Sequence, residues 1–170
     1  MDKRIEKTLV KIRIGLLSLV ADKDIADISV AELSRAAGID RKTFYLHYKT
    51  VDDALEELCD YTVQEVTAGF TGELVSDIKS LYDYLNNADE SLYQLISGEK
   101  SGEFRARFLH VVFTSEAFSR YYTGSDHCLI EGYLYSILYI YEKCRLSGRQ
   151  VDTSELAQMA ASLIEHGLKK

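Results

Sequence analysis

The sequence predicts an all-α protein, and three observations lead to this fold class. None of the 170 residues is proline, which is costly inside helices and common in loops. Apolar residues recur three and four positions apart along most of the chain, which is the spacing of one helix face. Helix-capping patterns precede several of these segments.

The first predicted helix runs from about Asp2 to Asp22. Its apolar residues fall at helical spacing: Ile5, Leu9, Ile12, Leu16 and Leu19. A separate basic stripe is formed by Arg4, Lys7 and Lys11. The polar segment 24–29 is predicted to be a loop.

Two short helices joined by a tight turn are predicted next. Ser29 and Glu32 have the spacing of a capping box, in which each side chain satisfies a backbone N–H of the other residue. About eight residues later Gly38 ends this helix, because glycine readily adopts the left-handed conformation found at helix ends. Asp40 then caps a second helix, whose core-facing residues are predicted to be Phe44 and Tyr48.

A long helix is predicted to start after Thr50, with two acids in its first turn, and to end near Gly69. Its buried stripe is predicted to be Val51, Leu55, Leu58, Thr62 and Val66. Further helices are predicted over Glu73–Asn86, Ser91–Ile96, Gly102–Tyr122, Asp126–Leu146 and Thr153–Gly167.

Charge is divided unevenly along the chain. The net charge is −7, yet the first fifty residues carry ten Lys or Arg against seven Asp or Glu, and the remainder carries ten against twenty. A basic end on an acidic body is compatible with nucleic-acid binding, because affinity follows the patch that faces the phosphates.

Other classes of protein find no support in the sequence. Cys59, Cys128 and Cys144 are isolated, so neither a metal centre nor a disulfide framework is expected, and free thiols fit a reducing cytoplasm. The charged N-terminal segment does not resemble a signal peptide, and no apolar run is long enough to span a bilayer. No cofactor, catalytic residue or membrane partner is predicted.

The helix capped by Asp40 carries cations on its first turn, as a helix that enters the DNA major groove would. Arg41 and Lys42 could read guanine, although a pair of solvated charges is the simpler alternative. Hydroxyls of Thr43 and Tyr45 could bond phosphates, and Leu46 could meet a thymine methyl or simply cover the base of the helix.

The first sixty residues resemble the DNA-binding region of TetR-family transcriptional regulators. The resemblance rests on Ser29–Leu33, on Ala36–Ile39 and above all on Thr43–Lys49, which follows the family pattern Thr-x-Tyr-x-His-aromatic-Lys. It implies that His47 and Lys49 contact phosphates, and Ser29 and Arg4 complete the predicted DNA-binding residues. The chain departs from the family at Lys42, where many members have a small residue, and at Val51, where many have Lys.

The resemblance also implies an effector pocket in the C-terminal part, where aromatic residues are dense between Tyr82 and Tyr122. Most of them could equally be ordinary core. The residues predicted to line a pocket are Tyr82, Phe104, Arg107, Phe108, His110 and Tyr122.

The last two predicted helices have wide apolar faces that predict a two-fold dimer interface. Leu134, Leu138 and Tyr141 give the first of these helices a second apolar face, which a partner would cover. The predicted interface consists of Tyr133, Ile137, Ile140, Met159 and Leu163.

Taken with the resemblance, these patterns predict a helix-turn-helix DNA-binding domain at residues 1–50 and a helical effector-binding and dimerisation domain at residues 51–170. The predicted function is that of a cytoplasmic homodimeric repressor, which binds a near-palindromic site in double-stranded DNA and is released by a small apolar or aromatic effector. A TetR-like coregulator or activator signalled by a partner protein is the first alternative. A small all-helical enzyme and a pure dimerisation module are the others, and no motif supports the enzyme.

Overall fold

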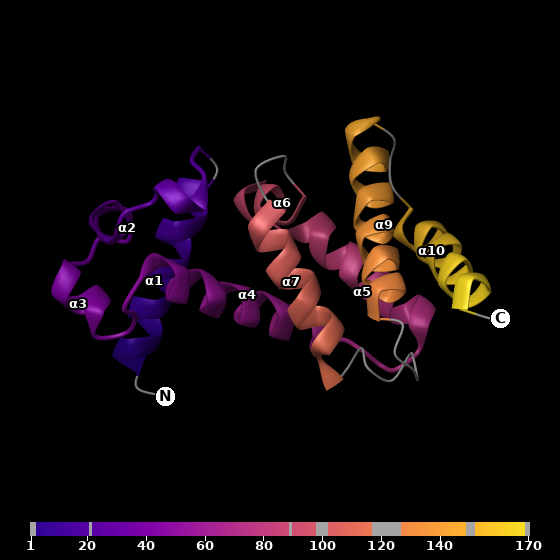
Figure 1. The fold of residues 1–170 in the computed structure, drawn as a ribbon, viewed down its shortest axis with the longest axis horizontal. Helices are drawn as coiled ribbons and strands as arrows, with labels where there is room; N and C mark the ends of the chain where they lie inside the picture. The colour runs from indigo at the N-terminus through magenta and orange to yellow at the C-terminus, as the bar shows by residue number, and fades with distance from the viewer. Residues whose placement is uncertain are drawn as a thin grey trace. The chain divides into compact units, whose positions relative to one another are not determined.

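A computed structural model describes residues 3–20, 22–88, 90–97, 102–116, 127–148 and 152–168. Throughout these residues the regular structure is helical, which confirms the predicted all-α class (Figure 1). The fold comprises two compact units, one formed by Met1–Tyr61 with Asp89–Phe104 and the other by Thr62–Ala88 with Arg105–Lys170. We call them the head and the body. The predicted domain boundary after residue 50 stays a prediction.

The head begins with α1 (Lys3–Val20), followed by the 3₁₀ turn η1 (Ile25–Asp27) and α2 (Val30–Ala36). Ile12 and Leu16 of α1 and Leu33 of α2 are fully buried, whereas Ile5, predicted to be on the inner face, is exposed near the start of α1. At Gly15, α1 lies so close to α2 that a Cβ atom would be 2.8 Å from the backbone nitrogen of Ala37. Glycine therefore permits this approach of the two helices.

Capping interactions define the ends of the next two helices, as predicted. Gly38 has a φ of 62°, which lets the chain turn from α2 into α3 (Arg41–Tyr45). The Asp40 carboxylate accepts the backbone N–H of Thr43 at 2.7 Å. Before α4 (Val51–Thr67), Thr50 and Asp53 accept each other's backbone N–H at 3.1 and 3.0 Å. The predicted buried stripe of α4 is confirmed, since Val51, Leu55, Leu58, Thr62 and Val66 are all buried.

The head also contains α6 (Glu90–Ser97), which packs on α1, and the first residues of α7 (Gly102–Thr114). The prediction that a single helix continues from Gly102 to Tyr122 was wrong at Ser115, where the chain bends. The hydroxyl of Ser115 donates to the carbonyl of Val112 at 2.6 Å, and that of Thr114 donates to the carbonyl of His110 at 2.9 Å. Such side-chain bonds compete with the helical backbone pattern.

The body is built from α5 (Leu74–Asn87), most of α7, α9 (His127–Leu146) and α10 (Thr153–Leu168), with α5 packed extensively on α10. The rings of Tyr82 on α5 and Tyr141 on α9 stack with centroids 5.2 Å apart. The Tyr141 hydroxyl donates to the side-chain oxygen of Asn86 at 2.6 Å, and Thr153 donates to Asp83 at 2.6 Å. Polar groups thus fix how these helices pack.

No helix within the described ranges is both long enough and apolar enough to cross a membrane.

Candidate nucleic-acid interface

The exposed surface of α3 and the turn that follows it combine cationic and apolar side chains. Arg41 and Lys42 are exposed on the first turn of α3, while Phe44 is fully buried and anchors the helix to the core of the head. Tyr45 is 57% exposed and Leu46 is 74% exposed. These two side chains expose apolar surface directly beside the cations of α3.

Thr43 is half-buried, and its hydroxyl already has a partner. It donates to the Asp40 carboxylate at 3.1 Å, beside the backbone N–H of the same residue. The hydrogen bond from the backbone N–H of Thr43, and after it the one from the Thr43 hydroxyl, lowers the pKa of Asp40. While the hydroxyl of Thr43 donates to Asp40, it cannot donate to a phosphate, so the predicted phosphate contact requires that this bond be exchanged.

Ser29 is likewise occupied by its helix cap. Its hydroxyl donates to the Glu32 carboxylate at 2.7 Å and accepts the backbone N–H of Glu32 at 3.3 Å. Lys23 forms an ion pair with the same carboxylate. The hydrogen bond from Lys23, followed by those from Ser29, lowers the pKa of Glu32 to about 2. The predicted DNA contact of Ser29 would again require exchange of a bond within the cap.

Three further residues that were predicted to bind DNA lie in the head. His47 is half-buried, with its ring centroid 6.4 Å from that of Tyr48. Lys49 is exposed, and its backbone N–H donates to Asp53 at 2.8 Å, which fixes the chain between α3 and α4. Arg4 is exposed on the first turn of α1. Every predicted DNA-binding residue therefore belongs to the same compact unit.

One supporting contact of the head was missed by the sequence reasoning. Arg13 on α1 forms a two-pronged ion pair with Glu57 on α4, and its guanidinium lies 3.7 Å from the centre of the Tyr61 ring. The hydrogen bond to Glu57 raises the pKa of Arg13, and burial together with Glu57 raises that of Tyr48. Helical spacing from Leu9 and Leu16 placed Arg13 on the inner face of α1, which was the available signal.

The residues predicted to line an effector pocket lie in different environments. Tyr82, Phe104 and Phe108 are fully buried, Arg107 is half-buried and His110 is exposed. Tyr122 lies outside the described residues. The effector assignment stays a prediction.

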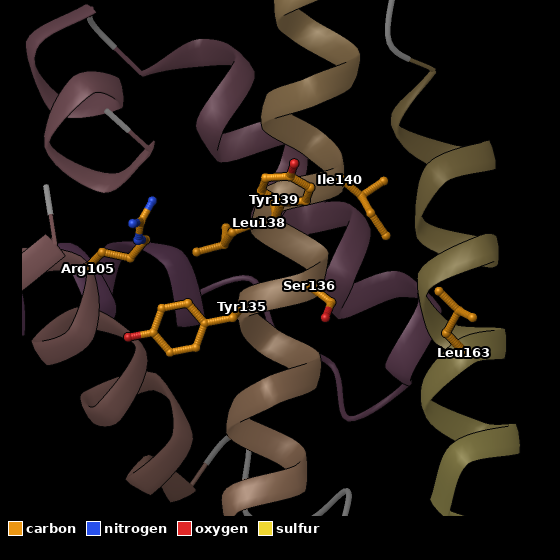
Figure 2. Close-up of a pocket in the computed structure, with 7 residues that line it drawn as sticks. All are labelled: Arg105, Tyr135, Ser136, Leu138, Tyr139, Ile140 and Leu163. Carbon is orange, nitrogen blue, oxygen red and sulfur yellow. The ribbon is translucent and has the colours of Figure 1, made fainter. Parts of the chain in front are cut away.

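A groove of about 580 Å³ lies in the body, along α9 (Figure 2). It is lined by residues of α7, α9 and α10: Arg105, Tyr135, Ser136, Leu138, Tyr139, Ile140 and Leu163. The predicted effector set included none of these residues.

The residues of the predicted dimer interface differ in exposure. Met159 and Leu163, one turn apart on α10, are 60% and 54% exposed. Tyr133 and Ile140 are half-buried on α9. Ile137 is only 3% exposed and packs inside the body, as do Leu134, Leu138 and Tyr141, which the sequence analysis had left for a partner to cover. The apolar side chains on α10 thus remain available, and the interface itself stays a prediction.

Among the described residues no group of His, Cys, Asp or Glu is arranged to hold a metal ion. Around the short helix α3, the head presents cations, hydroxyls and one exposed leucine. Such a surface is equipped to bind another molecule.

Several solved structures resemble this chain. The fatty acid degradation regulator FadR from Bacillus halodurans aligns with a TM-score of 0.57 and 16% identity over 95% of this chain and 96% of FadR. NalD, the secondary repressor of the MexAB-OprM multidrug efflux pump in Pseudomonas aeruginosa, aligns with a TM-score of 0.52 and 17% identity over 95% of this chain and 96% of NalD. A TetR transcriptional regulator from Rhodococcus sp. RHA1 aligns with a TM-score of 0.48 and 14% identity over 96% and 99%.

The alignments with FadR and NalD establish a shared fold. The chain has the fold of these two proteins, with α2, the turn at Gly38 and α3 in its head. No protein-family model matches the sequence, and no match was found among curated proteins.

Proposed function

We propose that this protein is a sequence-specific DNA-binding transcriptional regulator of the TetR type. The observation that carries the proposal is α3, where capped ends and the buried Phe44 support a helix whose outer surface presents Arg41, Lys42 and the 74% exposed Leu46. The shared fold with FadR and NalD, a regulator and a repressor, supports the same class. An enzyme finds no comparable support among the described residues.

In this proposal α3 enters the major groove with its first turn foremost. Arg41 and Lys42 read guanine through its O6 and N7 atoms, Leu46 contacts a thymine methyl, and the Tyr45 hydroxyl bonds a phosphate. Lys49 and the half-buried His47 bond phosphates beside the groove, which fixes register and carries no sequence information. Arg4 adds a charge near the flanking backbone.

The protein acts as a homodimer in this proposal. Met159 and Leu163 on α10 are exposed apolar side chains that a second copy would cover. Two heads related by a two-fold axis would bind half-sites roughly 34–36 Å apart, about one turn of DNA. The operator is therefore expected to be near-palindromic.

Release from DNA is proposed to follow the binding of a small molecule to the body, which favours one spacing of the two heads over another. Signalling by a partner protein, in a coregulator or activator of the same fold, is the alternative. A failure of small ligands to bind the groove of the body would favour this alternative.

The direct test is selection of bound sequences from random duplex DNA, followed by affinity measurements on the selected site and on an unrelated duplex. Arg41→Ala is expected to weaken binding to the selected site by about 1–3 kcal/mol and to relax one base position per half-site. Lys143→Ala removes an exposed cation from the body and is the matched control. If no sequence is enriched, or if Arg41→Ala weakens both duplexes equally, base reading by α3 is refuted.

The dimer is tested by sedimentation of Leu163→Glu against Gln158→Glu, a neighbouring exposed position on α10. A charge at Leu163 would be buried unpaired in the interface, so only this variant is expected to become monomeric and to bind the selected site more weakly. A monomeric wild type at micromolar concentration would contradict the two-fold arrangement.

A further inference from the structure

The groove in the body contains an arginine, Arg105, with a buried nitrogen that has no hydrogen-bond partner among the described residues. Arg105 extends from α7 toward α9, where it lies on the same side as Tyr135, while Ile140 and Leu163 lie on the side of α10 (Figure 2). Its Nε atom is buried and has no hydrogen-bond acceptor among the described residues. No carboxylate of those residues forms an ion pair with Arg105.

A buried donor without an acceptor is costly, and more so when it carries charge. Among the described residues that line the groove none is acidic, so these residues supply no counter-charge. A second cation, Lys143, lies nearby with its Nζ 5.1 Å from the centre of the Tyr139 ring. These charges favour an anion in the part of the groove between α7 and α9.

The remaining lining of the groove is mainly apolar. Tyr135 and Leu138 present a ring and an aliphatic side chain beside Arg105, and the ring of Tyr139 lies at the exposed surface of α9. Ser136 already donates to the carbonyl of Gly132 at 2.8 Å. The volume of about 580 Å³ falls within the usual range for small-molecule sites.

We propose that this groove binds a small organic acid, with its carboxylate on Arg105 and its apolar or aromatic body against Tyr135 and Leu138. The planar guanidinium suits a carboxylate because it can donate two parallel N–H bonds. If the protein is the regulator proposed above, such an acid is its effector class. It would act by joining α7 to α9, which lie on opposite sides of the bound molecule.

Calorimetry on the full chain tests this with two probe acids, 4-phenylbutyrate and octanoate, in a buffer free of carboxylates. The corresponding uncharged amides have nearly the same shape and serve as matched ligands. At least one acid is expected to bind, and its amide is expected to bind about tenfold more weakly or worse, because it lacks the charge that Arg105 meets.

Arg105→Met keeps much of the side-chain length and removes the charge. It is expected to weaken the binding of the acid about tenfold or more while leaving the melting temperature of the unliganded protein equal or higher, since an unpaired cation is lost. Lys79→Met, which removes a cation of α5 that is not among the lining residues of the groove, is the control and should bind the acid as the wild type does. A folded Arg105→Met that retains acid binding overturns the proposal, and so does loss of binding in Lys79→Met alone.

DNA binding separates this proposal from the previous one. If an acid binds through Arg105 and no DNA sequence is enriched, the site stands and the regulator does not. If DNA is bound and neither acid binds, this ligand site is refuted. If the wild type binds neither acid and Arg105→Met becomes monomeric, a second copy of the chain occupies the groove. That outcome also overturns the proposal.

Discussion

Polar contacts in the head are mostly local, apart from the ion pair of Arg13 with Glu57, whereas those compared with them in the body are long-range. In the head, polar side chains cap helices over three or four residues, as Ser29 does with Glu32 and Thr50 with Asp53. In the body, polar groups join helices that are far apart in sequence, as Tyr141 does with Asn86 and Thr153 with Asp83. The head is thus specified largely by local signals, and the body by packing partners that a local pattern does not reveal.

The same difference determines what each unit presents to its surroundings. In the head, the cations of α3 and the side chain of Leu46 are exposed. The body instead buries aromatic rings such as Tyr82 and Tyr141, and what stays open is the groove beside Arg105.

Alanine at two helical glycines should change stability in opposite directions. In Gly15→Ala a Cβ atom would lie 2.8 Å from the nitrogen and 3.0 Å from the Cα of Ala37, so α1 and α2 must separate, at a cost of about 1–3 kcal/mol. Gly132→Ala in α9 meets no atom within 4 Å and should stabilise by about 0.5–1 kcal/mol. Urea unfolding of both variants measures this. A neutral Gly15→Ala would contradict the close contact of the two helices.

Glu57→Gln should destabilise the head through Arg13. The guanidinium, whose side chain is 15% exposed, would lose its charged partner while still stacked on Tyr61. We expect a loss of about 1–2 kcal/mol, because a charge-assisted hydrogen bond is replaced by a weaker one. Thermal unfolding checks this, with Glu56→Gln as the exposed control on the same helix. Equal melting temperatures for the two variants would show that the ion pair contributes nothing.

Local contacts of the head could be predicted from the sequence, whereas contacts between distant segments could not. The caps at Ser29, Asp40 and Thr50 and the turn at Gly38 were predictable, because each lies within four residues of its partner or depends on backbone conformation alone. The bend at Ser115 was not, since the hydroxyl bonds of Thr114 and Ser115 resemble that of Ser136 within the continuous helix α9 and so give no sequence signal for a break.

In the body, the sequence predicted the helices but not how they pack. Apolar periodicity correctly placed α9 and α10, yet it could not decide which side of α9 packs inward, because both sides are apolar. The structure buries Leu134, Leu138 and Tyr141 and leaves Tyr139 exposed. The sequence analysis chose Arg107 and not Arg105, since the sequence does not show that Arg105 extends from α7 toward α9. In both cases the deciding contacts lie between helices distant in sequence.

Tyr141→Phe tests a bond of the body that no local pattern predicts. The variant keeps the ring stacked on Tyr82 and loses the bond to Asn86. Because Asn86 is exposed and water can replace the lost donor, we expect a cost of about 0.5–1 kcal/mol in urea unfolding. Tyr139→Phe, at the exposed surface of α9, is the control and should be neutral. A neutral Tyr141→Phe would mean that the bond to Asn86 contributes nothing to the packing of α5 on α9.

The smallest expected effect is a pH dependence of the cap at the start of α2. The pKa of Glu32 lies near 2, below its ordinary value of 4.5, because Lys23 and Ser29 hydrogen-bond to its ionised form. A carboxyl whose pKa is lower in the folded state stabilises the fold above its unfolded pKa, and this contribution is lost as pH falls through the folded value. The contribution of Glu32 is therefore present at neutral pH and declines between about pH 4.5 and about pH 2.

Glu32→Gln isolates that charge, since glutamine can still close a capping box. The melting temperature of this variant should lie slightly below that of the wild type at neutral pH, and the difference should shrink as pH falls below about 4.5 and vanish near pH 2. Glu65→Gln on α4 changes an exposed carboxylate that caps no helix, so it should produce no such convergence. A difference that stays constant down to pH 2 would assign the effect to the shape of the glutamine side chain, and the ionised Glu32 would then have no part in holding α2 in the head.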